Sequence, residues 1–248
     1  MHYNIVKGFL FFQIAFFLFL NTAFSQAKGY TKPNNTAKWK EYKRQVKADS
    51  SKKMVELKLV IPGIVYDLRY ATTNNFMRRL MYPAKTRFTF LRVDAVKALK
   101  QVQLKLNEMG LGLKIFDAYR PYAVTEKFWE LVHDERYVAN PANGSGHNRG
   151  TSLDLTIIYL ENGQELNMGT GFDNFTDTAH HSFTNLPESI FQNRMLLKSL
   201  MEQNGFKALE TEWWHYYLPN SNLYELLDVS FKKLARLNKQ KYVSTKPK

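Results

Sequence analysis

The segment from residue 140 to residue 163 constrains the fold of this chain more than any other. Residues 140–150 are rich in Asn, Gly, Pro and Ser, and a strongly strand-like apolar run follows over residues 153–160. Asn162-Gly163 then supplies the pair that a type I′ hairpin turn prefers, because both central positions of that turn need a positive φ. The segment therefore predicts a loop, a buried strand and a tight hairpin turn in that order.

Apolar periodicity predicts the other elements. Residues with helical spacing are expected to form helices over 91–109, 125–132, 189–203 and 222–237, and strand-like runs lie at 55–60, 111–116 and 213–218. Gly110 and Gly205 stand where the first and third of these helices need a residue that tolerates a left-handed conformation. Because the helices segregate from hairpin-linked strands, we expect an α+β domain with a mainly antiparallel central sheet flanked by helices.

The N-terminus has the pattern of a secretory signal peptide. Lys7 is the only Lys or Arg in the first 25 residues, an apolar run of 13 residues follows it at 8–20, and Ala23-Phe24-Ser25 ends the segment with small residues at the usual cleavage positions. The run is short for a bilayer span, which needs about 20 apolar residues. We therefore expect cleavage after Ser25 and export to the periplasm or the medium, with an uncleaved membrane anchor as the alternative.

The chain contains no cysteine. An exported protein can use disulfides, so this one must rely on packing and on any metal that it binds. The missing thiols also exclude a cysteine nucleophile, a thiolate-ligated metal site and a lipidated N-terminal cysteine.

Basic charge gathers at both ends of the chain, whose formal net charge is +13. Residues 28–53 hold nine Lys or Arg against two acids, and residues 232–248 hold seven and no acid. Such ends are typical of solvated tails, or of electrostatic contact with cell wall or an anionic membrane surface. Since no nucleic-acid motif is present, nucleic acid is not an expected partner. The predicted organisation is a signal peptide at 1–25, a basic linker at 26–50, one catalytic domain at 51–230 and a basic C-terminal tail at 231–248.

Two segments carry chemistry, Ser145 to Asp154 and Glu212-Trp213-Trp214-His215. Together they offer two imidazoles and two carboxylates, and a hydrolytic zinc site needs three such ligands with a fourth position open to water. With His147, Asp154 and His215 as ligands, the site keeps a net positive charge and Glu212 remains free to act as a base, whereas a fourth protein ligand would close the open position. A surface histidine in a Gly/Ser loop and a Trp-Trp pair in the core are the plain alternatives.

The spacing of these residues requires irregular backbone. His147 and Asp154 are seven positions apart, and Glu212 and His215 are three apart. In a regular strand an odd separation places side chains on opposite faces. We therefore expect a bend between the first pair, which Gly146 and Gly150 make possible, and a strand end at one member of the second.

An ordered series of motifs over residues 64–218 resembles the D-alanyl-D-alanine dipeptidase family of zinc D,D-peptidases. Residues 145–154 are similar to the zinc motif of the family, and that motif alone also occurs in carboxypeptidases and hedgehog-like domains. The whole series is more specific; it comprises Tyr70-Ala71-Thr72, Asp117-Ala118-Tyr119-Arg120-Pro121, Ser145 to Asp154, Met168 to Asp173, Asn193-Arg194 and Glu212 to Tyr216.

The resemblance implies a role for each matching residue. His147, Asp154 and His215 would hold one Zn²⁺ per chain, and Glu212 would activate water. Arg120 would stabilise the oxyanion, a role that suits its fixed charge and fork of donors. Asp173 would receive the free ammonium group of a D,D-dipeptide, and Tyr70 and Ser145 would line the substrate pocket. His133, His180 and His181 are expected to be structural rather than ligands.

Three functions remain open from the sequence. The first is hydrolysis of D-alanyl-D-alanine to two D-alanine molecules in cell-wall peptide turnover or recycling. The second is a D,D- or L,D-carboxypeptidase that trims peptidoglycan, and an Asp173 contact with the ammonium group would argue against it. The third is a non-catalytic, zinc-stabilised wall-binding module, which would need neither Glu212 nor Arg120.

Overall fold

The computed structural model describes residues 29–244. The chain divides into two units, residues 1–32 and 33–248, and every element named below lies in the second. The predicted signal peptide falls outside the described residues. Among residues 29–244, no helix combines the length and apolarity that crossing a bilayer requires.

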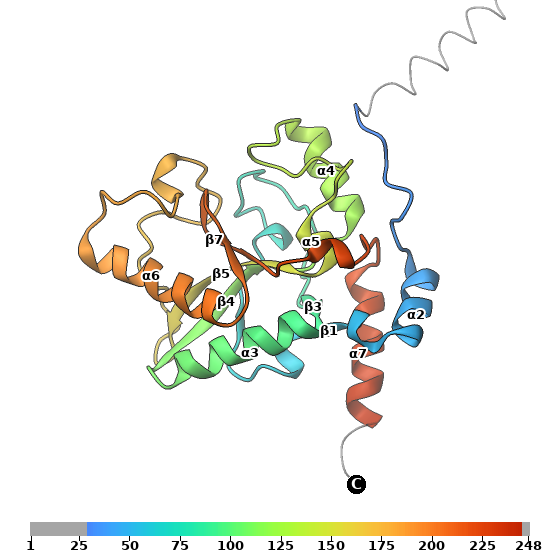
Figure 1. Ribbon diagram of the computed structural model, residues 1–248, viewed down its shortest axis with the longest axis horizontal. Coiled ribbons are helices and arrows are strands. Elements are labelled where there is room, and N and C mark those ends of the chain that lie inside the picture. The colour runs from blue at the N-terminus through green and yellow to red at the C-terminus, as the bar shows by residue number, and fades with distance from the viewer. Residues whose placement is uncertain (1–28, 245–248) are drawn as a thin grey trace, which may run out of the picture. The chain divides into compact units, whose positions relative to one another are not determined.

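A five-stranded mixed sheet organises the fold (Figure 1), and its strand order is β2-β4-β5-β7-β6. Only the β2–β4 pair is parallel, and the other three pairs are antiparallel. The strands are β2 (Val65–Tyr66), β4 (Leu111–Asp117), β5 (Ser152–Tyr159), β7 (Glu212–Tyr217) and β6 (Lys207–Leu209). A separate antiparallel pair joins β1 (Met54–Glu56) to β3 (Phe90–Arg92). The predicted α+β class with a mainly antiparallel sheet is confirmed.

Helices and short 3₁₀ turns surround the sheets. The α-helices are α2 (Trp39–Ala48), α3 (Val93–Asn107), α4 (Tyr122–Val132), α5 (Gly146–Arg149), α6 (Glu188–Gln203) and α7 (Phe231–Ser244). The 3₁₀ turns are η1 (Ser50–Lys52), η2 (Leu57–Leu59), η3 (Arg69–Ala71), η4 (Asp177–Ala179) and η5 (Ser221–Leu223). Helices α3 and α6 contact each other and the sheet, and their apolar faces close the main core.

The central elements match their predicted ranges to within a few residues. Helix α3 ends before Gly110 (φ 71°), and α6 ends before Gly205 (φ 91°). Both glycines adopt the left-handed backbone that was expected to terminate these helices. The Asn162-Gly163 turn has its glycine at positive φ, 73°, but Asn162 is not among the described non-glycine residues with positive φ, so the predicted type I′ turn is wrong. The N–H of Gly163 donates to the carbonyl of Tyr159 at 2.8 Å, and the N–H of Tyr159 donates to the carbonyl of Gln164 at 2.9 Å, which closes a longer hairpin loop.

Two predicted elements differ in the structure. The strand predicted over residues 55–60 stops at Glu56, because the Glu56 carboxylate accepts a hydrogen bond from the backbone N–H of Leu59 at 3.1 Å and caps the turn η2. The helix predicted over 222–237 begins only at Phe231. Leu227 is instead held in an extended segment, since it bridges to Ala37 and its N–H donates to the carbonyl of Asn148 at 3.0 Å.

The two basic ends contain more structure than a solvated tail. Helix α2 lies within the predicted linker 26–50 and buries Tyr42, whose hydroxyl accepts from the N–H of Met54 at 2.9 Å. Helix α7 starts at the first residue of the predicted tail and buries Leu234 and Asn238. Asn238 donates to the carbonyl of Met54, so both helices are anchored to strand β1.

Candidate active site

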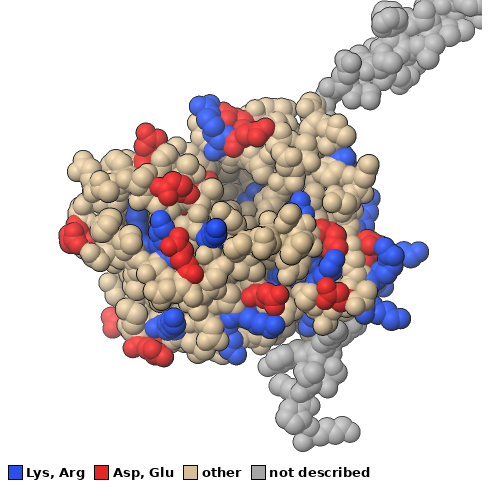
Figure 2. All heavy atoms as spheres, in the orientation of Figure 1, with Lys and Arg blue, Asp and Glu red and all other residues tan. Residues whose placement is uncertain are grey.

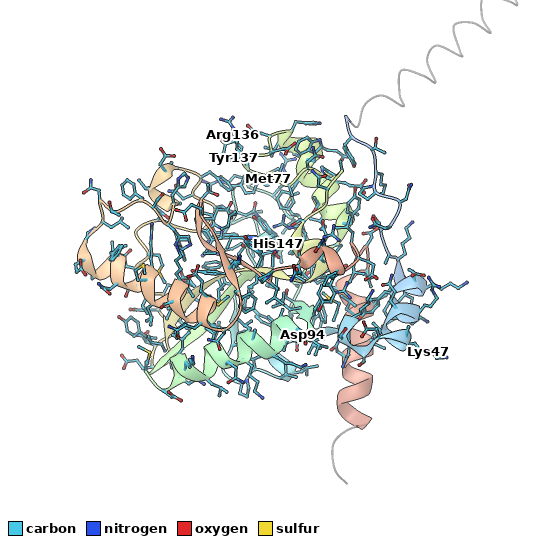
Figure 3. The ribbon with its side chains drawn as sticks, viewed as in Figure 1. Lys47, Met77, Asp94, Arg136, Tyr137 and His147 are labelled. Atoms are coloured by element: carbon cyan, nitrogen blue, oxygen red, sulfur yellow. The ribbon has the colours of Figure 1, made fainter. Side chains whose placement is uncertain are left out.

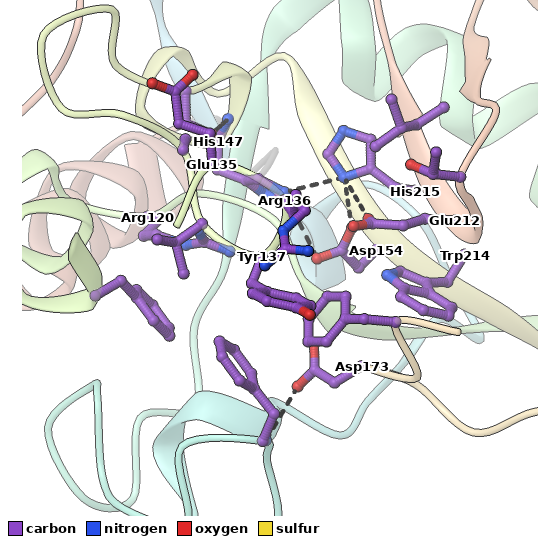
Figure 4. Close-up of a pocket in the computed structure, with 18 of the residues that line it drawn as sticks. Arg120, Glu135, Arg136, Tyr137, His147, Asp154, Asp173, Glu212, Trp214 and His215 are labelled. Atoms are coloured by element: carbon purple, nitrogen blue, oxygen red, sulfur yellow. Dashed lines mark hydrogen bonds and ion pairs between the residues drawn. The ribbon is translucent and has the colours of Figure 1, made fainter. Parts of the chain in front are cut away.

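Three side chains far apart in the sequence converge in the interior of the described chain. His147, Asp154 and His215 each present one ligand atom, and these atoms lie within 4.8 Å of one another. Nδ1 of His215 lies 2.8 Å from Oδ1 of Asp154 and 3.4 Å from Nε2 of His147 (Figure 4). The second carboxylate oxygen of Asp154 lies 3.5 Å from Nε2 of His147. These three are the ligands that the sequence predicts.

A left-handed glycine turns the chain between His147 and Asp154. His147 lies on α5, a single helical turn, and Asp154 lies on β5. Gly150 ends α5 with φ 72° and ψ 31°, so the chain reverses directly into the strand. The predicted bend between these two residues is confirmed.

A bulge brings Glu212 and His215 to the same side of the sheet. Glu212 is the first residue of β7, as expected for one member of this pair, and the register between β6 and β7 shifts at Ala208 and Leu209. Such a shift leaves residues unpaired and reorients side chains along the bulged strand. As a result Oε2 of Glu212 lies 3.9 Å from Nδ1 of His215.

The backbone sets the tautomer of His147. Its Nδ1 lies 2.7 Å from the carbonyl oxygen of Ala118, which can only accept a hydrogen bond, so Nδ1 carries the proton. The lone pair of Nε2 then faces Asp154 and His215. Burial lowers the pKa of both histidines, which keeps the imidazoles neutral. A neutral imidazole that has one ring nitrogen held by a hydrogen bond and the other free is the usual arrangement of a metal ligand.

The negative charges of Asp154 and Asp117 are not fully compensated by the cation beside them. Burial raises the pKa of Asp154 and of Asp117, since each carboxylate is removed from water. Arg120 is the cation that faces them, and its guanidinium is already engaged by Asp117. A divalent cation among two neutral imidazoles and one carboxylate would compensate the charge of Asp154, so the residues present fit a zinc ion.

Arg120 is held by a partner that the sequence analysis did not assign. Asp117 Oδ2 accepts from Nε and Nη2 of Arg120 at 3.2 and 2.8 Å, while Oδ1 accepts from the hydroxyl of Tyr82 at 2.6 Å. The guanidinium also lies over the rings of Tyr70 and Phe128, at 5.2 and 4.9 Å from their centroids. Asp117 stands three residues before Arg120 in the same motif, which is the signal that could have identified it.

A pocket of about 670 Å³ opens above these residues. It forms the hollow visible on the face shown in Figure 2. His147 lies deep in the molecule, whereas Arg136 and Tyr137 lie at the outer edge (Figure 3). The side chains that line the pocket include every predicted site residue, namely Tyr70, Arg120, Ser145, His147, Asp154, Asp173, Glu212 and His215.

Asp173 presents its carboxylate to the pocket from a loop. Its backbone is left-handed (φ 62°), and its oxygens accept from the hydroxyl of Tyr70 at 3.0 Å and the N–H of Phe76 at 3.4 Å. Burial raises the pKa of Asp173 to about 7. Burial also raises the pKa of Glu212 to about 7. Two partly buried carboxylates with raised pKa values in one pocket are typical of a functional site.

Ser145 has a structural part in the site. Its hydroxyl accepts from the N–H of His147 at 3.1 Å, and its own N–H donates to Asn148, so Ser145 caps the turn that carries His147. Ser145 also lines the pocket. Its contact with substrate stays a prediction.

The other histidines of residues 29–244 lie outside the group formed by His147, Asp154 and His215. His133 ends α4 in a left-handed conformation, and His180 lines the pocket rim near Asp177. His181 donates its backbone N–H to Glu210.

Aromatic residues at the mouth of the pocket were not predicted as site residues. Phe76 and Phe128 stack with their centroids 5.9 Å apart, and Phe175 contacts both Phe76 and Tyr137 edge to face at 5.1 Å. In the sequence such residues are indistinguishable from core aromatics, because only the fold shows that one side of each ring faces a cavity.

Comparison with known proteins gives one consistent family. The family model for D-ala-D-ala dipeptidases, peptidase family M15, matches residues 50–234. A D-alanyl-D-alanine dipeptidase of Escherichia coli (strain K12) is 35% identical over 178 residues, covering 72% of this chain and 91% of that relative. A D-alanyl-D-alanine dipeptidase of Enterococcus faecalis (strain ATCC 700802 / V583) is 29% identical, covering 64% of this chain and 88% of that relative. One from Enterococcus faecium is 31% identical, covering 65% and 92%.

Proposed function

The chain belongs to the D-Ala-D-Ala dipeptidase family of peptidases, and we propose that it hydrolyses free D-alanyl-D-alanine to two D-alanine molecules with one zinc ion per chain. The observation that carries the proposal is the convergence in one pocket of a His-Asp-His triad, the buried Arg120 and the partly buried carboxylates of Glu212 and Asp173. A structural metal site would require only the triad.

His147, Asp154 and His215 would hold the metal. When bound there, zinc supplies a Lewis acid that polarises the peptide carbonyl and makes water more acidic. The side chains position it: Ala118 fixes the tautomer of His147, and β5 and β7 are paired at Asp154 and His215 themselves. The third ligand is therefore set by sheet register rather than by a loop.

Glu212 would act as the general base. It begins β7 next to His215, lines the pocket and has a pKa of about 7, which suits a group that accepts a proton from the attacking water and returns it to the leaving amine. The proton acceptor is thus distinct from the three ligands.

Arg120 would stabilise the oxyanion that develops on the substrate carbonyl. Its guanidinium is buried, permanently charged and fixed in the pocket wall by Asp117, so little reorganisation is needed when negative charge develops. Such preorganisation is worth more in a buried site than in water.

Asp173 would bind the free ammonium group of the substrate. An ammonium beside a buried carboxylate favours the ionised form of Asp173, and the hydroxyl of Tyr70 would hold that carboxylate in place. A substrate whose amino terminus is blocked has no charge to offer and would leave the Asp173 carboxylate without a cationic partner. This requirement separates a dipeptidase from a carboxypeptidase.

D-alanine release tests the proposal. Zinc-loaded protein lacking residues 1–25 would be given D-Ala-D-Ala and N-acetyl-D-Ala-D-Ala. We expect turnover of the free dipeptide alone, a loss of about 10²–10⁴-fold in kcat for Glu212→Gln, and weaker discrimination for Asp173→Asn. Glu210→Gln and Asp177→Asn remove exposed carboxylates close to these two positions and serve as matched controls.

The other outcomes identify the competing functions. Equal or faster cleavage of the acetylated substrate would assign the protein as a carboxypeptidase. Stoichiometric zinc binding with no release of D-alanine from either substrate would favour the non-catalytic wall-binding module.

We further propose that the protein is exported and acts on wall-derived dipeptide outside the cytoplasm. The apolar run after Lys7 supports export. Exposed basic residues on α2, among them Lys40, Lys43 and Lys47, support electrostatic contact with the wall or an anionic membrane surface. Fractionation tests the location, and recovery of full-length protein chiefly from the cytoplasm would contradict it.

A further inference from the structure

Helix α6 is linked to the pocket through the loop that carries Asp173. This loop, defined here as residues 168–180, leaves the strand β5 hairpin and ends just after η4. Asp173 lies at its middle, and helix α6 follows it in the chain. The Asn193-Arg194 pair on α6 is a family-like motif that none of the catalytic roles above uses.

Arg194 joins the two ends of the loop 168–180. Its Nε donates to the carbonyl of Met168 at 2.7 Å, at the start of the loop. Its two terminal nitrogens donate to the carbonyls of Thr178 at 2.9 Å and His180 at 3.2 Å, at the end of the loop. One side chain therefore closes the base of a compact loop whose middle residue reaches the pocket.

The environment of Arg194 indicates that an arginine is needed at this position for these three hydrogen bonds and not for an ion pair. The residue is only 4% exposed, and among the described residues no carboxylate forms an ion pair with it. A buried cation without a counter-charge is costly, and an apolar side chain of similar length would pack at lower cost. What an apolar side chain cannot supply is several donors in a fixed plane for the carbonyls at both ends of the loop.

The backbone of the loop is shaped to receive this side chain. Gly169 adopts φ 82°, and a Cβ there would lie 3.0 Å from Ile190 and 3.4 Å from Nη2 of Arg194. Asn193 adds a fourth hydrogen bond from α6, donating to the carbonyl of Asn167 at 2.9 Å. The loop therefore lies directly against the helix at its first residues.

The middle of the loop needs this support. Asp173 has a left-handed backbone, which an aspartate adopts at some cost in free energy. Around it the loop is held chiefly by aromatic packing, in which Phe172 contacts Phe116 at 4.8 Å and Phe175 contacts Phe76, together with the hydrogen bonds that Asp173 accepts from Tyr70 and Phe76. Hydrogen bonds at both ends and aromatic packing at the middle together over-determine the position of the carboxylate.

We propose that Arg194 is a positioning residue that holds Asp173 in register with the pocket and thereby sets the selectivity for substrates with a free amino terminus. The inference rests on the proposed function of Asp173. Arg194 itself does not line the pocket and would contact neither substrate nor metal.

The test compares Arg194→Met, Arg194→Lys and Asn193→Ala in the zinc-loaded protein. For Arg194→Met we expect KM for D-Ala-D-Ala to rise by about tenfold, because the charge-assisted hydrogen bond between the displaced Asp173 and the substrate ammonium group is weakened. The value of kcat should change less. The preference for the free over the acetylated dipeptide should narrow by a similar factor. Arg194→Lys should recover part of this preference, because lysine keeps one charged donor. Asn193→Ala removes a single hydrogen bond and replaces Arg194→Met in the test if that variant does not fold.

Arg92 provides a matched control. It is fully buried and also donates to three backbone carbonyls, those of Lys52, Arg149 and Glu225, none of which lies in the loop 168–180. Arg92→Met should lose stability and should slow both substrates by the same factor. A change of selectivity in Arg194→Met that Arg92→Met does not share supports positioning. Equal effects of the two substitutions would overturn it.

Hydrogen exchange separates this inference from the proposed function. Faster amide exchange within 168–180 in Arg194→Met, with α3 unchanged, shows the loss of the clamp whatever the substrate proves to be. If the wild-type protein cleaves neither dipeptide, the proposed function fails, and exchange alone then decides the positioning role. Unchanged exchange in 168–180 would overturn the role of Arg194 even in an active dipeptidase.

Discussion

Asp117 Oδ2 accepts hydrogen bonds from both Nε and Nη2 of Arg120, and the two residues are three positions apart in the chain. Both lie in the segment that leaves β4, and the N–H of Arg120 also donates to the carbonyl of His147 at 3.1 Å. The arginine is thus fixed to the turn that carries His147, one of the proposed metal ligands. Its orientation depends on the same strand end that positions the triad.

Asp117→Asn should lower kcat much more than it raises KM. The amide keeps the shape of the side chain but offers only one acceptor oxygen, so at least one of the four hydrogen bonds that the carboxylate accepts, from Tyr82, Ala118 and twice from Arg120, is lost. Hydrogen bonds to charged groups are worth about 1.5–3 kcal/mol, which corresponds to roughly 10- to 100-fold in rate. Steady-state kinetics on D-Ala-D-Ala measures the effect.

Glu56→Gln is the control for Asp117→Asn. Glu56 is buried and accepts from the hydroxyl of Tyr66 at 2.8 Å, but it lies in β1, outside the pocket. It should lose stability and keep its kcat. A kcat for Asp117→Asn equal to that of wild type would show that Arg120 does not need its partner.

Removing the metal should destabilise the fold without unfolding the sheet. A ligand that binds only the native state stabilises it by about 4 kcal/mol when present at a thousand times its Kd. For a domain of this size that corresponds to a fall in Tm of roughly 8–16 °C on chelation. Differential scanning calorimetry with and without EDTA checks this, and zinc should restore the original Tm.

His215→Ala should abolish the response to EDTA, because the triad loses its third ligand. His133→Ala removes a histidine that lies outside the triad and should respond to EDTA as wild type does. A Tm that is insensitive to chelator in wild-type protein would argue against a metal at these residues.

The buried carboxylate of Asp173 should make the metal-free protein less stable as pH rises. Its pKa is about 7 in the folded chain against an ordinary value of 3.8, so between pH 4 and 7 the folded state binds a proton that the unfolded state has released. Stability falls with pH wherever the folded state binds more protons. Asp173 alone should contribute about 2–3 kcal/mol of this loss between pH 5 and 8.

Guanidinium unfolding in EDTA at pH 5 and pH 8 measures the dependence. Asp173→Asn should reduce the difference between the two pH values, whereas Asp177→Asn, which removes an exposed carboxylate from the same loop, should not. If Asp173→Asn leaves the pH dependence of stability unchanged, that dependence arises from other carboxylates, such as those of Asp154 and Asp117.

The central sheet and its helices could be predicted because the signals there are local. The positive φ of Gly163 and of the glycines after α3 and α6 follows from the backbone preference of a single residue in each case. The ends of the domain could not be predicted in this way. Residues 226–229 stay extended only because Leu227 pairs with Ala37 and Asn148, contacts that span long stretches of sequence.

The candidate site divides along the same line. His147, Asp154, His215 and Glu212 could be proposed from the sequence because a metal site needs particular residue types at short spacings. Asp117, Tyr82 and Arg194 were missed because each acts by holding another residue, and a supporting hydrogen bond leaves no compositional signal. Their roles become visible only when the distances are known.

Gly150 lies between two of the proposed ligands, His147 and Asp154. Gly150→Ala places a side chain at φ 72°, which costs roughly 1–2 kcal/mol for a residue other than glycine. The added Cβ would also lie 2.4 Å from Cε of Met54, which is fully buried and must shift. Chemical denaturation should show a loss of stability, and zinc affinity, measured by competition with a chromophoric chelator, should fall because His147 and Asp154 flank this turn.

Gly163→Ala is the control that separates the backbone cost at positive φ from the contact with Met54. Gly163 has nearly the same backbone conformation, φ 73°, but a Cβ there would meet nothing within 4 Å. It should therefore carry the conformational cost alone and leave zinc affinity unchanged. If the two variants lose the same stability and bind zinc equally, the close packing of the turn against Met54 does not contribute to the site. A larger loss at Gly150 with weaker zinc binding shows that the geometry of the triad is set by this one turn.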